Sequence, residues 1–430
     1  MRLKVDNFRF LVQQIRKSEF SKNSAVLLGG TFLAQLIPVG ISPILTRIYS
    51  PAEFGVLALF VSIAKIISVF ITGRYESAIV LPKEDKGGVN LLFVCLILTF
   101  VSFVLLTAFS LFFKSSLLAL LNSEGMEQWL PWIPFTALLM AMIQVLNNWL
   151  LRNKKFKALS SGKVVQAIST GGVQVSSFSG ALVVGNISGQ VVLIISYLKS
   201  SFAGIWALRS EVSRAEMWLN MKRYKNFPLV TSLHRFFDLL QSNVLISLIS
   251  SLFSTAILGF YSLTTRTLLA PAALIGSAVG NVFYQKATSY HQNGLPILPL
   301  AQKVVLALLG LGFIGFGILF FAADLIFETV FGPEWVVCAL YTRILTPWLF
   351  LNFISAPVSG LVNVLGEQRT FFVISAFGNT IAVAVFAFVG WKYQDIQTSL
   401  FCFSGLMSAY TLVYLFSIFK ALKKFDKTCV

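Results

Sequence analysis

The chain has 430 residues with a mean hydropathy of +0.80, and only 12% of its residues are charged. A soluble domain carries about a quarter of its residues as Asp, Glu, Lys or Arg, so this composition excludes a water-soluble enzyme and a secreted disulfide scaffold and indicates a chain that lies in a lipid bilayer. The net charge of +17 would suggest nucleic acid as a partner of a soluble protein, but in a membrane protein it reflects orientation, anionic lipid or an anionic cargo, and no nucleic acid partner is expected.

Hydrophobic runs long enough to cross a bilayer follow one another along the chain. A helix that spans about 30 Å of hydrocarbon needs about 20 residues. The runs cover residues 25–45, 55–80, 89–113, 129–151, 164–184 and 187–208, and then 228–252, 255–283, 297–323, 336–363, 370–391 and 397–419. We therefore predict an all-α polytopic integral membrane protein with 12 transmembrane helices, in which tight hairpins at residues 185–188 and around Ser254 join neighbouring spans.

The predicted tails and loops divide the chain into two lobes, a linker and two terminal segments. Residues 1–24 place apolar side chains on one helical face and basic ones elsewhere, which predicts a cytoplasmic basic amphipathic segment. We expect an N-terminal lobe over 25–208, a cytoplasmic linker over 209–227, a C-terminal lobe over 228–419 and a cytoplasmic tail over 420–430. Nearly all Lys and Arg residues outside the spans fall on one side, and the opposite loops contain only Arg47, Lys114 and Lys392. Both termini are therefore expected in the cytoplasm.

Residues that carry catalysis or bind metals form no recognisable pattern. The cysteines (Cys95, Cys338, Cys402, Cys429) and histidines (His234, His291) are scattered, so neither a metal site nor a catalytic triad is expected. The sequence has no GxxxxGK[ST] loop that would cradle the phosphates of ATP. We expect a secondary transporter and not an enzyme, with no cofactor other than a coupling ion, Na⁺ or H⁺.

An internal repeat relates the two halves. The segment Ser50–Leu59 aligns without gaps onto Ser254–Leu263, with Ser, Ala, Gly and Leu matching at a constant offset. The same offset superposes the first six spans on the last six, and because six is an even number the halves share one orientation. Two parallel lobes of this kind are typical of alternating-access transporters whose cargo binds between the lobes.

Glycine and proline positions add two local expectations. The GxxxG pairs Gly185 with Gly189 and Gly276 with Gly280 indicate close helix packing. Pro271 predicts a bend within the span over 255–283.

Charged residues inside the predicted spans are expensive, at about 2.5 to 3.5 kcal/mol each near the bilayer centre. The basic ones are Lys65, Arg74, Lys199, Arg235, Arg266, Lys303 and Arg343, and the acidic ones are Glu76 and Asp238. Lys303, Arg343 and Arg74 lie toward span ends, where long side chains also reach the interface. This surplus of positive charge suits a phosphate or pyrophosphate cargo and disfavours the export of cationic drugs.

From these residues we predict a cationic cavity that binds substrate, formed by Lys65, Arg266, Arg235, Lys199 and Arg74. Lys65 and Arg266 lie on repeat-equivalent helices and are expected to face each other between the lobes, with a buried structural pair as the alternative. Asp238 and Glu76 are candidates for coupling transport to an ion. Arg235 and Asp238 lie three residues apart, so a neutralising pair is the alternative for that aspartate.

Three motifs carry a resemblance to a known family. They are Gly73-Arg-Tyr-Glu-Ser-Ala-Ile-Val-Leu-Pro82-Lys83, then Leu258-Gly-Phe-Tyr-Ser-Leu-Thr-Thr-Arg266 followed by Pro271, and Phe331-Gly-Pro-Glu-Trp335. From about Ser24 to about Lys420 the chain resembles the polysaccharide transporter branch of the multidrug/oligosaccharidyl-lipid/polysaccharide (MOP) exporter superfamily, which contains the O-antigen flippases of the Wzx type. One departure is Phe237-Asp238-Leu239, because many relatives have an Arg directly after this Asp.

The resemblance implies 12 helices in two six-helix, MATE-like lobes in a bacterial inner membrane. It implies transfer of an undecaprenyl-pyrophosphate-linked oligosaccharide, such as an O-antigen unit of lipopolysaccharide, to the opposite leaflet, driven by an ion gradient. The implied partners are this substrate, membrane lipids and other polysaccharide assembly proteins, and the working unit is expected to be a monomer. The residues also leave open a MATE-like drug or cation antiporter, a lipid II flippase of the MurJ type and a membrane-embedded polysaccharide polymerase.

Overall fold

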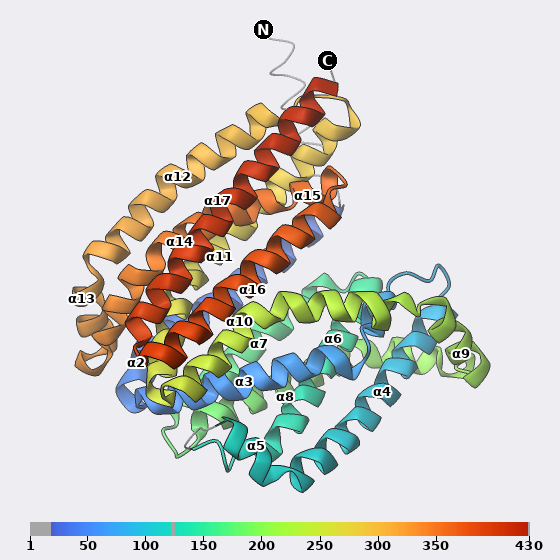
Figure 1. Cartoon of the computed structure of the whole chain (residues 1–430). Helices are drawn as coiled ribbons and strands as arrows, with labels where there is room; N and C mark the ends of the chain where they lie inside the picture. Colours follow the sequence, from blue (N-terminus) through green and yellow to red (C-terminus); the bar gives the residue numbers. More distant parts are fainter. Residues whose placement is uncertain (1–18, 122–124, 429–430) are drawn as a thin grey trace. The chain divides into compact units, whose positions relative to one another are not determined.

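Figure 1 shows a computed structural model of the chain, which describes residues 19–121 and 125–428. Side chains are described for these residues except 19–25, 28, 120–121, 230–231, 233–242 and 428. The predicted amphipathic segment over residues 1–24 lies almost entirely outside them and stays a prediction. The chain divides into two compact units. Unit 1 consists of Met1–Ile41, Ile63–Lys114 and Trp129–Phe236, and unit 2 of Ser42–Ser62, Ser115–Gln128 and Phe237–Val430.

Helices build both units, and no strand occurs among the described residues. Unit 1 contains most of α2 (Glu19–Ile48), the end of α3 (Pro51–Ile71), α4 (Asp85–Phe112), α6 (Ile133–Arg152), α7 (Phe156–Val175), α8 (Ala181–Ala207) and α9 (Arg214–Arg223). Unit 2 contains the rest of α2 and α3 and nearly all of α5 (Lys114–Leu121). It also contains most of α10 (Ser232–Leu252) and all of α11 (Thr255–Gln292), α12 (Leu298–Phe321), α13 (Ala323–Ile326), α14 (Val337–Ser359), α15 (Leu361–Val364), α16 (Gln368–Tyr393) and α17 (Ile396–Thr428).

Ten helices of the described chain are long and apolar enough to cross a membrane. They are α2, α3, α4, α6, α8, α11, α12, α14, α16 and α17. Their surfaces expose large apolar side chains, such as Phe112 at 86% and Phe321 at 84%, and such surfaces are stable against lipid. The chain is therefore a multi-pass membrane protein, and the predicted all-α class is confirmed. The two remaining predicted spans correspond to α7 and α10, so 12 crossings stay a prediction.

The end of the second predicted span is wrong. We expected helix over residues 55–80, but α3 ends at Ile71. Gly73 and Arg74 adopt φ values of 54° and 60°, and a right-handed helix cannot continue through such residues. Tyr75–Ala78 then forms a separate 3-10 turn, η1.

The hairpin predicted at residues 185–188 is also wrong, because these residues lie inside α8 and the chain turns over residues 176–180 instead. A Cβ on Gly185 would lie 2.6 Å from the Gln174 side chain, and one on Gly189 would lie 1.9 Å from the Thr170 hydroxyl. These glycines let α8 approach α7 closely, as their spacing predicts. The other predicted hairpin is confirmed, since Ser254 caps α11 by accepting a hydrogen bond from the Ile257 amide at 3.2 Å.

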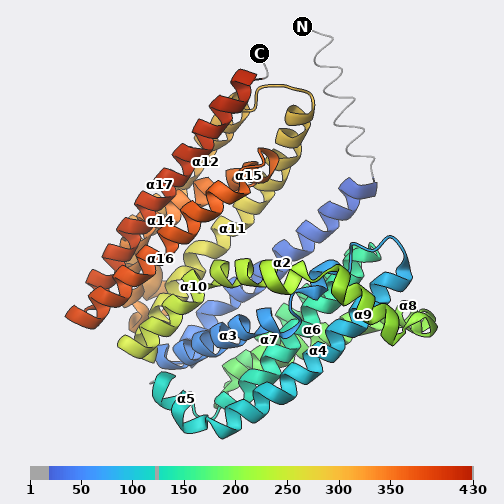
Figure 2. The same ribbon diagram turned by 45° about the vertical axis from the view of Figure 1, so that its right-hand side comes forward.

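Each unit has its own core. In unit 1, buried Leu91, Leu92 and Cys95 of α4 pack against Val145 and Trp149 of α6. In unit 2, α14 lies between α11 and α17, and α16 lies along α17, as Figures 1 and 2 both show. These pairings position the groove described below.

Candidate functional site

The two segments of the internal repeat cross each other within unit 2. A Cβ on Gly55 of α3 would lie 1.8 Å from the Thr255 carbonyl oxygen, and a Cβ on Gly259 of α11 would lie 1.8 Å from the Pro51 carbonyl oxygen. Pro51 and Gly55 align with Thr255 and Gly259 in the repeat. The repeat therefore exchanges the two contacts, as a two-fold axis that relates the two segments requires. Only glycine allows the backbones to approach this closely.

The Phe331–Trp335 motif packs beside this crossing. The Trp335 side chain is fully buried, and its indole N–H donates to the Thr46 carbonyl oxygen at 2.9 Å. Its ring contacts Phe54 of α3 and Phe260 of α11, with ring centroids 5.0 and 5.7 Å apart. Two of the motifs behind the family resemblance and both copies of the repeat thus meet in one part of unit 2.

The third motif forms a buried turn in unit 1. The Arg74 guanidinium lies 3.0 Å from the Glu76 carboxylate and donates to the Gln144 side chain at 3.2 Å. The Thr72 hydroxyl donates to the same carboxylate, which is 1% exposed. Arg74 Nε is buried and has no hydrogen-bond partner among the described residues. The turn therefore neutralises both charges internally, and the substrate and ion-coupling roles predicted for Arg74 and Glu76 stay predictions.

Arg152 holds the segment that follows this turn, a role that the sequence did not reveal. Its guanidinium donates to the carbonyl oxygens of Ile79, Pro82 and Glu84 at 3.1, 2.7 and 2.9 Å, and it pairs with Asp85 at 3.0 Å. From the sequence we had placed Arg152 only among the residues that orient the chain. A basic residue at the end of a span does not indicate in the sequence which carbonyl groups it binds.

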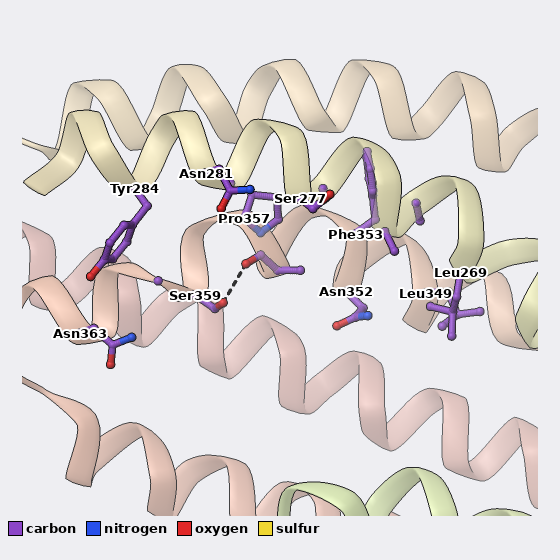
Figure 3. A pocket seen from close by; sticks show the side chains of 16 residues that line it. Leu269, Ser277, Asn281, Tyr284, Leu349, Asn352, Phe353, Pro357, Ser359 and Asn363 are labelled. Carbon is purple, nitrogen blue, oxygen red and sulfur yellow. Dashed lines mark hydrogen bonds between the residues drawn. The ribbon is translucent and has the colours of Figure 1, made fainter. Parts of the chain in front are cut away.

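A groove of about 510 Å³ runs between α11 and α14 in unit 2 (Figure 3). Its polar side chains are uncharged: Ser277, Asn281, Tyr284, Asn352, Ser359 and Asn363. Gly276 and Gly280 also line the groove, and a Cβ on either would lie within 4 Å of Pro357 on α14. Amides, hydroxyls and an aromatic ring without any carboxylate or ammonium group match the hydroxyls of a sugar better than a charged ligand.

A second cavity of about 530 Å³ shares Asn352 and Ser359 with this groove. It is lined by α10, α11, α14, α16 and α17, and its described lining residues are also uncharged. The carbonyl oxygen of the Asn379 side chain is buried and has no hydrogen-bond partner among the described residues. Such an orphaned acceptor in a cavity suits a polar ligand that donates a hydrogen bond.

Arg266 precedes the groove on α11 and is not one of its lining residues. It precedes the lining residue Leu269 by three positions on α11, which is about 4.5 Å along the same helical face. Arg266 is partly buried, and Pro271 follows it inside α11 without ending the helix. The groove that follows Arg266 on α11 is neutral and polar, so the charged residues of the sequence do not indicate it.

None of the other predicted cavity residues whose side chains are described is among the lining residues of this groove. Lys65 is exposed on the part of α3 that belongs to unit 1, so its pairing with Arg266 stays a prediction. Lys199 is exposed on α8, on the same face as the exposed side chains of Ile195 and Phe202. This apolar face suits contact with lipid. The side chains of Arg235 and Asp238 lie outside those that the structure describes.

The two residues predicted at span ends are also located. Lys303 is exposed on α12. Arg343 of α14 is paired with Asp324 of α13, with one of its contacts at 3.3 Å. Neither lines the groove.

Comparison with solved structures identifies the fold. The chain is similar to the lipid II flippase MurJ in an inward closed conformation, with a TM-score of 0.69 over 94% of this chain and 90% of that one at 14% identity. It is similar to an inward-facing MATE transporter of the MOP superfamily, with a TM-score of 0.61 over 94% and 95% at 14% identity. For a variant of the Vibrio cholerae MATE transporter VcmN, the TM-score is 0.57 over 94% and 96% at 14% identity.

Comparison of the sequence assigns the family. A search of curated proteins gave no match. The family described as polysaccharide biosynthesis protein matches residues 44–340, which is more than half of the chain and includes all three motifs. The chain therefore belongs to the polysaccharide biosynthesis protein family and has the fold of the MOP-superfamily transporters.

Proposed function

We propose that the protein is a flippase that moves an undecaprenyl-pyrophosphate-linked oligosaccharide, such as an O-antigen or other surface polysaccharide unit, across the bacterial inner membrane by alternating access. The observation that carries the proposal is the neutral polar groove that begins one helical turn from Arg266. A lipid-linked oligosaccharide has the matching sequence of chemical groups, since its pyrophosphate suits a guanidinium and its sugars suit amides and hydroxyls.

The remaining parts of the proposal follow from the sequence. The protein crosses the membrane 12 times as a monomer, with both termini in the cytoplasm. A Na⁺ or H⁺ gradient drives transport, and Asp238 and Glu76 are the candidates for coupling. Lys65, Arg235, Lys199 and Arg74 join Arg266 in binding the anionic part of the substrate.

The chemistry of the groove favours this function over drug export. An antiporter for cationic drugs needs carboxylates where the drug binds. Among the described residues, neither of the two neutral cavities that share Asn352 is lined by an Asp or a Glu.

Reconstitution into vesicles tests the proposal. Proteoliposomes receive a polyprenyl-pyrophosphate oligosaccharide on one leaflet, and a lectin added outside reports its appearance on the other. We expect transfer with the wild type, a loss of at least about tenfold with Arg266→Gln, and partial retention with Arg266→Lys. Lys303→Gln, an exposed basic residue away from the groove, serves as the matched control. Export of ethidium without any transfer of the oligosaccharide would identify a drug antiporter instead.

A further inference from the structure

A further groove of unit 2, which is basic and has a volume of about 610 Å³, lies between α16 and the C-terminal end of α17. It is lined by Lys420, Lys423, Lys424 and Lys427, with Phe371 and Ile374 as apolar neighbours. The lysine spacing of three, four and seven residues places four ammonium groups on one face of α17. Figures 1 and 2 show that α16 packs along α17.

The last turns of α17 are held in place, so the lysines are presented by a fixed helix. The Asp426 carboxylate accepts hydrogen bonds from the amides of Ile297 and Leu298 at 3.0 and 2.9 Å, just before and at the start of α12. The Phe425 ring stacks on His291 with centroids 4.7 Å apart. Leu422 is fully buried in the core of unit 2.

The groove lies at the edge of the apolar surface of the same two helices. Val413 and Phe416 of α17 are 55% and 71% exposed, and Phe377 of α16 is 70% exposed. Lys420 follows Phe416 by one turn, which is about 6 Å along the helix. Lipid headgroups lie at this boundary between the apolar and the charged surface of a membrane protein.

The charge of the groove is strongly positive. Its acidic residue, Glu367, accepts a hydrogen bond from the Thr370 hydroxyl at 3.1 Å. None of the four lysines forms an ion pair with a carboxylate of the described residues. A general excess of basic residues on one side of the membrane explains their number. It does not explain their convergence, beside two apolar side chains, on one groove.

We propose that this groove binds the phosphate of a membrane lipid, with the lysines around the headgroup and the hydrocarbon chains along the exposed apolar surface of α16 and α17. The proposal is independent of the transported cargo. Two sources share this chemistry, an anionic phospholipid and a prenyl pyrophosphate, and we expect the phospholipid because it is the abundant one. Bound lipid would fix α17 at the headgroup level.

Native mass spectrometry of the purified full chain in detergent tests this site. The probes are dioleoylphosphatidylglycerol and geranylgeranyl pyrophosphate, with dioleoylphosphatidylcholine as the neutral reference. The test variant changes Lys420, Lys423, Lys424 and Lys427 to Gln, and a second variant changes the same four to Arg. The matched control removes four exposed lysines elsewhere: Lys83, Lys154, Lys157 and Lys225.

We expect the Gln variant to bind phosphatidylglycerol at least about tenfold more weakly than the wild type, while the Arg variant and the matched control bind as the wild type does. A loss confined to the prenyl pyrophosphate would also support the groove and would assign the carrier lipid to it. Equal binding of both anionic lipids by the Gln variant and the wild type would overturn the proposal. An equal loss in the matched control would overturn it too, because net charge would then suffice.

Discussion

The reciprocal glycine contacts make a sharp prediction about the crossing of α3 and α11. An alanine at position 55 or 259 places a Cβ 1.8 Å from a carbonyl oxygen, whereas ordinary contact begins at 3.4 Å. The two helices must therefore separate by about 1.6 Å, and overpacking of this kind costs about 1–3 kcal/mol. Because both distances are the same, Gly55→Ala and Gly259→Ala should lower stability equally.

The double variant sharpens this test. Once one alanine has separated the helices, the second has less to displace, so the combined loss should be smaller than the sum of the single losses by about 1 kcal/mol or more. The assay is thermal unfolding in detergent, followed by tryptophan fluorescence. Gly310→Ala and Gly405→Ala are the matched controls, since a Cβ at either position has no neighbour within 4 Å. Unequal single losses, additive losses, or equal losses in the controls would refute the reciprocal crossing.

Three further outcomes are expected. Glu76→Gln should destabilise the protein by about 3 kcal/mol because it leaves the Arg74 guanidinium without its counter-charge, and adding Arg74→Gln should restore part of the loss in the same melting assay. Hydrogen bonds from Thr398 and Gln397 lower the pKa of Asp395, so its contribution to stability is present above about pH 4 and is lost as the pH falls through the lowered pKa; Asp395→Asn should make the melting temperature fall less steeply below about pH 4. Trp335→Phe should cost about 1–2 kcal/mol through the lost indole hydrogen bond, and an unchanged melting temperature would contradict its packing role.

The sequence predicts the helices because each span needs a long apolar run, and the runs are separated by charges and turns. It predicts the repeat because aligned segments keep their spacing. The partners of individual side chains are less visible. The end of α3 depends on the positive φ of Gly73 and Arg74, which hydropathy does not register. The groove includes Asn281 and Asn352, which line one cavity only because α11 packs on α14.

For the basic residues, too, the sequence does not reveal the partners of the side chains. Sequence position identifies Arg74 and Arg266 as costly charges, but it does not say that Glu76 neutralises the first or that a polar groove begins beside the second. Both facts depend on the tertiary packing of segments that the sequence places far apart or in an irregular turn. The Asn residues of α11 and α14 are a signal that the sequence does contain, because uncharged amides are also costly in lipid.

The central claim is that sugar hydroxyls occupy the groove between α11 and α14. The most direct measurement uses the vesicle assay with two cargoes, a polyprenyl-pyrophosphate oligosaccharide and the same carrier without sugars, each with its own probe. The transfer rate of each cargo is measured for the wild type and for Asn352→Leu. Asn352 lines both of the neutral cavities of unit 2. The account predicts that Asn352→Leu slows the oligosaccharide at least about tenfold and leaves the bare carrier unchanged. Equal slowing of both cargoes, or of neither, would contradict it.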